Sequence, residues 1–172
     1  MRKTQYSTKK IAFLGLMLAV IVVLLAIERM LPPVPFFPPN FKLGLSNIII
    51  MFAIFFMGAK DAFVLGVLKS FFNTLMRGVV GGAISLAGGM LSIAAIAGLM
   101  WISRNKMSVL SLSIAGAIFH NIGQIIVAII ILRSPHLFML YLPVLLVAGV
   151  VMGSLTGICV KIVMPVFERI YK

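Results

Sequence analysis

The sequence contains very few acidic residues. Of its 172 residues only Glu28, Asp61 and Glu168 are acidic, and no two of them are near one another. Enzymes that act on diphosphates hold Mg²⁺ with clustered carboxylates, which this chain does not offer. The sequence also lacks a Gly-x-x-x-x-Gly-Lys-Ser/Thr loop for ATP and any His/Cys spacing typical of zinc. We therefore predict that the chain is not an enzyme and has no catalytic residue, metal or cofactor.

Charge of either sign is scarce. Only 10% of the residues are charged and 62% are hydrophobic, whereas a soluble domain has roughly 25% charged residues. So few charges cannot cover a water-soluble surface around this much apolar material, so the bilayer must be the solvent. The single cysteine, Cys159, excludes an internal disulfide.

Long apolar runs occupy most of the chain. One spanning helix needs about 20 apolar residues, and the runs are separated by proline, glycine and polar clusters. The sequence predicts an all-α bundle of six transmembrane helices, forming a single integral membrane domain over residues 1–172. The predicted spans are about 11–31, 43–57, 62–76, 84–102, 109–132 and 137–163.

The basic residues predict the orientation of the spans. The net charge is +12, but Lys and Arg stand at the ends of apolar runs and form no nucleic-acid motif, so we expect no nucleic-acid partner. With the N-terminus inside, ten basic residues fall on the cytoplasmic side and four on the other. Lysine and arginine favour cytoplasmic loops. We therefore expect a multi-pass protein of the cell membrane with both termini in the cytoplasm.

Several polar side chains lie inside predicted spans, where ionisable groups are costly and mark candidate sites. Lys69, Asn73 and Arg77 share one helix face because they are four residues apart. His120 lies roughly 16 Å into its span, level with Asn73. The residues predicted to bind substrate in the outer half of the bundle are Glu28, Lys42, Asn47, Lys69, Asn73, Arg77, Ser85, His120, Asn121 and Gln124.

The excess of positive charge in this set favours a small ligand that is anionic or a strong hydrogen-bond acceptor. Other interpretations remain open for individual residues. Lys69 could extend its ammonium to the interface, and Arg77 could be an ordinary interfacial anchor. Asn73 and Gln124 could tie helices together. Glu28 could pair with a neighbouring basic residue at the surface.

Small residues predict close helix contacts. Ala12, Gly15 and Ala19 share a face of the first span, and three glycines do the same on the last span, at positions 149, 153 and 157. Such faces let helices approach closely in membranes. We interpret the face on the last span as packing within the bundle. Packing and docking on a partner membrane protein are both open for the first.

Several segments resemble a known family. They are Lys42-Leu43-Gly44-Leu45-Ser46-Asn47 after Glu28 and a proline-rich loop, Ser85-Leu86-Ala87-Gly88-Gly89, the stretch from Gly116 to Gln124, and Tyr141-Leu142-Pro143-Val144-Leu145-Leu146. Together they resemble the Gx transporter family, also catalogued as heptaprenyl diphosphate synthase component I. Lys69 stands where that family would have an arginine, which keeps a basic group but not a bidentate one.

The family is in turn similar to the substrate-binding S components of energy-coupling factor transporters. The resemblance implies six helices and an outer pocket. It also implies docking through helix one, at Ala12, Gly15 and Ala19, onto a transmembrane coupling subunit served by two ATPases. The implied ligands are vitamins, cofactor precursors or quinone- and isoprenoid-related compounds. The alternatives are a non-catalytic membrane subunit of a prenyl-diphosphate synthase, or of an electron-transfer complex that binds quinone or haem at His120.

Overall fold

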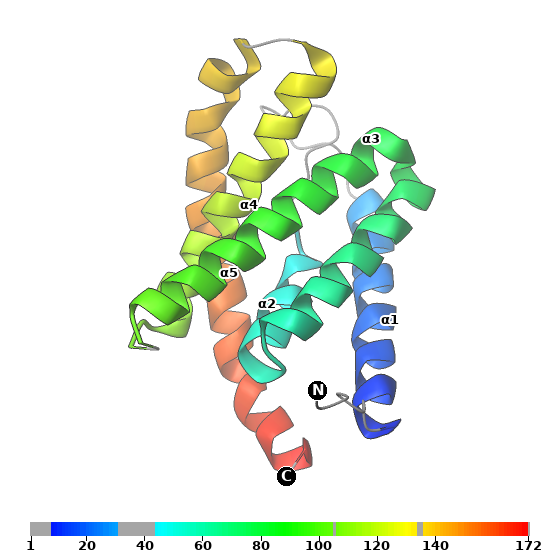
Figure 1. Cartoon of the computed structure of the whole chain (residues 1–172), viewed down its shortest axis with the longest axis vertical. Coiled ribbons are helices and arrows are strands. Elements are labelled where there is room, and N and C mark those ends of the chain that lie inside the picture. Colours follow the sequence, from blue (N-terminus) through cyan, green and yellow to red (C-terminus); the bar gives the residue numbers. More distant parts are fainter. Residues whose placement is uncertain (1–7, 31–43, 105, 134–135, 172) are drawn as a thin grey trace, which may run out of the picture.

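The structure is a computed structural model that describes residues 8–30, 44–104, 106–133 and 136–171. These residues form five helices: α1 Thr8–Met30, α2 Asn47–Phe56, α3 Ala59–Ile102, α4 Val109–Leu132 and α5 His136–Tyr171 (Figure 1). All except α2 are long and apolar enough to cross a membrane. The chain is therefore an all-helical membrane protein, as its composition predicts.

The helix count in the described residues is five, not the predicted six, because α3 is one element bent at Gly78. Gly78 has φ 78° and ψ 174°, which is not helical. A straight helix of 44 residues would be about 66 Å long, roughly twice the hydrocarbon thickness of a bilayer. Instead the chain reverses at the bend (Figure 1). The predicted third and fourth spans are the two arms of α3, a first arm (59–77) and a second arm (79–102).

Glycines and one asparagine make the bend possible. The Asn73 side-chain amide donates a hydrogen bond of 2.9 Å to the Gly81 carbonyl oxygen across the bend. A Cβ at Gly82 would lie 1.8 Å from Thr74 Oγ1, so only glycine lets the two arms come this close. Only glycine readily adopts the backbone conformation of Gly78. The sequence Arg77-Gly78 followed by glycines at 81 and 82 thus builds a tight helical hairpin.

The second predicted span is also shorter than expected. Helix α2 has ten residues and a length of about 15 Å, half of the hydrocarbon thickness. Helix α2 cannot begin earlier, because Gly44 has a positive φ of 78°. The backbone N–H of Asn47 donates a hydrogen bond to the Gly44 carbonyl oxygen and closes a turn there. Ser46, at the end of this turn, is 1% exposed. The N-terminus of α2 therefore lies inside the protein.

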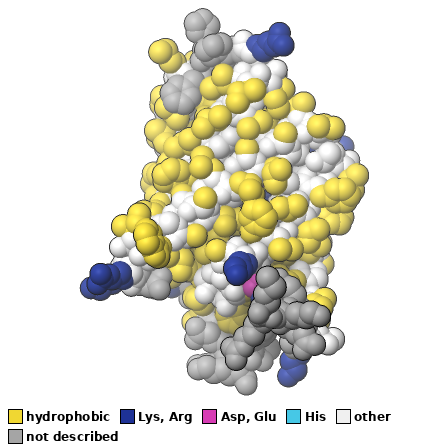
Figure 2. Space-filling model, viewed as in Figure 1, with side chains coloured by type: hydrophobic (Ala, Val, Ile, Leu, Met, Phe, Trp, Pro, Cys, Tyr) yellow, Lys and Arg dark blue, Asp and Glu magenta, His cyan; other side chains and the backbone are white. Residues whose placement is uncertain are grey.

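Charged residues stand mainly at the two ends of the bundle. Helix α1 begins and α5 ends at the same end, and the bend of α3 lies at the opposite one (Figure 1). Figure 2 shows a face covered largely by apolar side chains, with Lys and Arg at its upper and lower ends. At the end where α1 begins, Lys10 Nζ lies 2.7 Å from Asp61 Oδ2 and ties α1 to the first turn of α3.

The apolar core is divided into two clusters. The larger one joins α1, α2 and the first arm of α3 with Ile96, Leu112 and Val160. The smaller one, near the opposite end, consists of Ile84, Ile125, Ala128 and Leu145. On the second arm of α3, on α4 and on α5, the residues between the two clusters include buried serine, histidine and threonine. The polar site lies in this interval.

Candidate functional site

Two cavities lie between the apolar clusters, and both are lined by Gly44 and His120. We call the first the charged cavity. It lies among α1, both arms of α3, α4 and the turn before α2. Seven of the residues predicted to bind substrate line it: Glu28, Lys69, Asn73, Arg77, Ser85, His120 and Gln124.

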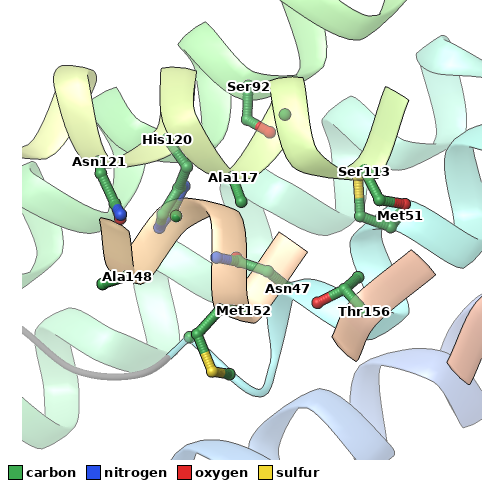
Figure 3. Close-up of a pocket in the computed structure, with 13 residues that line it drawn as sticks. Asn47, Met51, Ser92, Ser113, Ala117, His120, Asn121, Ala148, Met152 and Thr156 are labelled. Carbon is green, nitrogen blue, oxygen red and sulfur yellow. The ribbon is translucent and has the colours of Figure 1, made fainter. Parts of the chain in front are cut away.

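The second cavity, which we call the hydroxyl cavity, runs between α4 and α5 beside the first turn of α2. Its polar lining consists of the two asparagines and the histidine predicted from sequence, together with three hydroxyl side chains. In Figure 3, Asn47 lies between His120 on one side and Ser113 and Thr156 on the other. The polar residues are Asn47, Ser92, Ser113, His120, Asn121 and Thr156.

The turn before α2 holds the acidic and basic groups of the site in place. The Lys69 ammonium donates a hydrogen bond to Asn47 Oδ1, and the Ser46 backbone N–H lies 3.4 Å from Glu28 Oε1. A Cβ at Gly44 would lie 2.8 Å from Asn47 Nδ2, so a larger residue would displace that amide. The Glu28 carboxylate is placed at the N-terminus of α2, where the helix dipole stabilises negative charge.

His120 and Gln124 form a hydrogen-bonded pair on α4. Gln124 Nε2 lies 3.0 Å from His120 Nε2. With the Gln124 amide in this orientation, its nitrogen donates and the imidazole accepts at Nε2, which leaves the ring proton on Nδ1. A Cβ at Gly88 would lie 2.9 Å from His120 Nδ1, and one at Gly123 would lie 2.8 Å from the Ala87 carbonyl oxygen. Glycine at both positions lets the second arm of α3 pack directly against this pair.

Two of the predicted binding residues also join helices. Asn73 Nδ2 is bonded to Gly81 O across the bend of α3, and Asn121 Nδ2 donates to Leu145 O on α5 at 2.7 Å. The other amide atom of Asn73, Oδ1, is buried and has no hydrogen-bond partner, and the residue lines the charged cavity. Asn73 therefore has both a structural contact and an atom available to a ligand.

Buried polar side-chain atoms without a hydrogen-bond partner are concentrated around the two cavities. Such an atom costs about 1–3 kcal/mol unless water or a ligand satisfies it. Among the described residues, all but one of these atoms belong to residues that line the two cavities, the exception being an oxygen of Asp61. They are Ser46 Oγ, Asn73 Oδ1, Ser113 Oγ, His120 Nδ1 and Gln124 Oε1. Water or a polar ligand could satisfy these atoms, which makes the two cavities the candidate site.

The cavities are small in this arrangement. The charged cavity has a volume of about 20 Å³ and the hydroxyl cavity one of about 30 Å³. A site of this size holds one or two water molecules. A larger ligand fits only when the helices around Gly44 and His120 move apart.

The structure brings together the predicted binding residues that it describes. Each of them lines one or other cavity, while Lys42 lies outside the described residues. Their role in binding stays a prediction. Sequence reasoning missed Ser46, Ser92, Ser113 and Thr156. Ser92 and Ser113 could have been found, because each is seven residues from a predicted site residue, Ser85 or His120, and a spacing of seven returns to the same helix face.

The small residues of α1 and α5 have different surroundings. Ala12, Gly15 and Ala19 are exposed on α1, and a Cβ at Gly15 would meet nothing within 4 Å. On α5, a Cβ at Gly153 would lie 2.6 Å from Ile114 Cα. Gly149 and Gly157 also pack closely on α4. The glycines of α5 serve packing within the bundle, as predicted, whereas the α1 face is not used for it.

The fold and the site define a helical membrane protein with two small polar cavities between two apolar clusters. Comparison with protein families identifies it further. The chain belongs to the family described as heptaprenyl diphosphate synthase component I, whose sequence model matches residues 17–163. This confirms the family resemblance found in the sequence. The searches of curated proteins and of solved structures gave no match.

Proposed function

We propose that this protein is a substrate-binding membrane subunit for the uptake of a small molecule, and not an enzyme. A partner ATPase module would supply the energy, as in energy-coupling factor transporters. The observation that carries the proposal is the buried polar site. Lys69, at 5% exposure, and His120, also at 5%, would be costly in an inert bundle, because charged and polar groups inside a membrane are expensive.

The proposal includes an orientation in the cell membrane. Six segments would cross or enter the bilayer, counting the two arms of α3 separately and α2 as a half-length segment. Both termini would be cytoplasmic, which agrees with the positive-inside rule and with α1 beginning and α5 ending at one end of the bundle (Figure 1). The charged cavity, toward the opposite end, would then receive its ligand from outside the cell.

The α1 face formed by Ala12, Gly15 and Ala19 would dock on a transmembrane coupling subunit. Its exposure supports this role, because small residues let another helix approach closely in a membrane. Lipid would cover the face when no partner is bound. Two ATPase subunits would complete the complex.

Ligand capture can be tested on the purified protein. Native mass spectrometry of the wild type should detect a retained small molecule, and thermal-shift screening should find compounds that raise the unfolding temperature. Lys69→Met should abolish both effects, because it removes the buried cation but keeps the side-chain length. Lys60→Met, at an exposed position, is the matched control and should retain them. Equal binding by the two variants would show that the site is assigned wrongly.

Partner docking needs a separate test. Affinity purification from native membranes should recover ATPase subunits with the wild type but not with Gly15→Leu. Gly89→Leu is the control, since a Cβ at either glycine meets nothing within 4 Å. Recovery of the same ATPase activity with all three proteins would exclude docking through α1.

A second candidate function is favoured by the family description. The chain would be the non-catalytic membrane component of a prenyl-diphosphate synthase, with a separate catalytic subunit as its partner. In that case a synthase subunit, not an ATPase, should co-purify, and its Mg²⁺-dependent prenyl transfer should change when the chain is present. Prenyl transfer by the purified chain alone would contradict both candidates.

A further inference from the structure

The charges and unpaired atoms of the two cavities define a ligand class. We propose that the ligand is an elongated monocarboxylate. Its carboxylate binds in the charged cavity, and an uncharged body with hydrogen-bonding groups extends past Gly44 and His120 into the hydroxyl cavity. The proposal deepens the receptor function proposed above and rests on it.

The charge of the ligand follows from the charged cavity. Its described lining contains two cations, Lys69 and Arg77, and one acid, Glu28. His120 adds no charge, because its Nε2 accepts from Gln124. One positive charge is left over. Lys69 is 5% exposed whereas Arg77 is half-buried, and a buried charge such as that of Lys69 requires a partner. A carboxylate balances it, whereas a phosphate monoester, with a charge of about −1.5 to −2, would bring an excess of negative charge.

The ligand must also donate hydrogen bonds. Asn73 Oδ1 and Gln124 Oε1 are buried acceptors without partners. The bond from Asn73 Nδ2 to Gly81 O fixes the direction of Oδ1. An anion that only accepts, such as acetate, would leave both oxygens unsatisfied. An N–H or O–H group close to the carboxylate would satisfy them.

The hydroxyl cavity suits the uncharged body. No Lys, Arg, Asp or Glu is among its described lining residues, which combine hydroxyls with Met51 and Met152. The buried Ser113 hydroxyl has no partner. Ser113 and His120 are seven residues apart on α4, which corresponds to about 10 Å. A ligand that reaches from the charged cavity to Ser113 is therefore longer than a simple short-chain acid.

N-(4-hydroxybenzoyl)glycine is a suitable probe, because it joins a carboxylate, an amide N–H and an uncharged ring that ends in a hydroxyl group. It should raise the unfolding temperature of the purified protein in a concentration-dependent way. In N-(4-hydroxybenzoyl)glycinamide a neutral carboxamide replaces the carboxylate, and 4-hydroxybenzoate lacks the glycine unit with its length and N–H. Each should bind at least tenfold more weakly. The proposal is overturned if the amide or 4-hydroxybenzoate binds as well as the probe, or if the probe does not bind.

Variants separate the two cavities. Lys69→Met should abolish the response to N-(4-hydroxybenzoyl)glycine. Ser113→Ala/Thr156→Val should weaken it about three- to tenfold, because hydrogen bonds to the phenolic hydroxyl at the far end of the body are lost. Ser154→Ala is the control on α5 and should bind as the wild type does, since its hydroxyl bonds to Val150 O of its own helix. An unchanged affinity of the double variant would exclude the hydroxyl cavity from the binding site.

Failure of this proposal can be told apart from failure of the receptor function. Native mass spectrometry of the wild type measures whether any small molecule is retained. A retained molecule that is not a monocarboxylate would leave the receptor function intact and overturn the ligand class. No retained molecule, together with no response to the probe, would overturn both.

Discussion

Lys69 on the first arm of α3 donates a hydrogen bond to the side-chain carbonyl of Asn47, the first residue of α2, across 22 positions of sequence. This bond joins the two parts of the site, because Lys69 lines the charged cavity and Asn47 lines the hydroxyl cavity. It also gives the buried ammonium a partner inside the bundle. The stability of the fold and the chemistry of the site therefore depend on the same contact.

The Lys69–Asn47 bond should be visible in unfolding experiments. Asn47→Ala leaves a buried ammonium without this acceptor and should destabilise the protein by about 1–3 kcal/mol. Lys69→Met/Asn47→Ala should cost less than the sum of the single changes, because the two residues interact. Thermal unfolding can be followed through the reaction of a thiol-specific dye with Cys159, the single cysteine. Strict additivity of the two changes would show that the bond contributes nothing.

The bend of α3 should depend on the backbone conformation of Gly78. Gly78→Ala should destabilise the protein by about 1–3 kcal/mol, since few residues other than glycine adopt this φ and ψ. Gly98→Ala is a matched control in the second arm. A Cβ at either position would meet nothing within 4 Å, but only Gly78 has a positive φ. Gly98→Ala should keep or raise the unfolding temperature, and equal effects would contradict a special conformation at the bend.

The packing of α5 on α4 should require glycine at 153. Gly153→Ala would place a Cβ 2.6 Å from Ile114 Cα and should cost about 1–3 kcal/mol through overpacking. Gly15→Ala, at the exposed face of α1, should leave the unfolding temperature unchanged. If Gly153→Ala unfolded at the wild-type temperature in the same dye assay, α4 and α5 would not be packed this closely.

The Lys10–Asp61 ion pair should stabilise the end of the bundle where α1 begins. The Asp61 side chain is 4% exposed and the Lys10 side chain is 29% exposed. The free-energy cost of breaking the pair should therefore lie between the costs measured for exposed and for fully buried ion pairs. Asp61→Asn should cost on the order of 1–3 kcal/mol. Lys10→Asp/Asp61→Lys should restore only part of this, because a lysine in the first turn of α3 opposes the helix dipole. An unchanged unfolding temperature of Asp61→Asn would show that the pair is not stabilising.

Sequence reasoning located the site but did not find its full extent. The pattern at Lys69, Asn73 and Arg77, and that at His120 and Gln124, could be read from helical spacing alone. Ser92 and Ser113 gave only a weak signal, their spacing of seven from Ser85 and His120, and Thr156 gave none. Hydroxyl residues are common in membrane helices and are not costly there, so they do not stand out in the sequence. Only the packing of the first turn of α2 beside α4 and α5 shows that these hydroxyls line a cavity.

By itself the sequence determined that this is a helical membrane protein, because so few charges leave the bilayer as the only solvent. It also determined which faces carry the polar groups, since helical periodicity is local. The tertiary structure decided how many separate helices form, where α2 begins and how the cavity divides into a charged and a hydroxyl part. These features depend on contacts between distant residues, such as Lys69 with Asn47 and Asn73 with Gly81, and on glycine conformations that a hydropathy pattern does not contain.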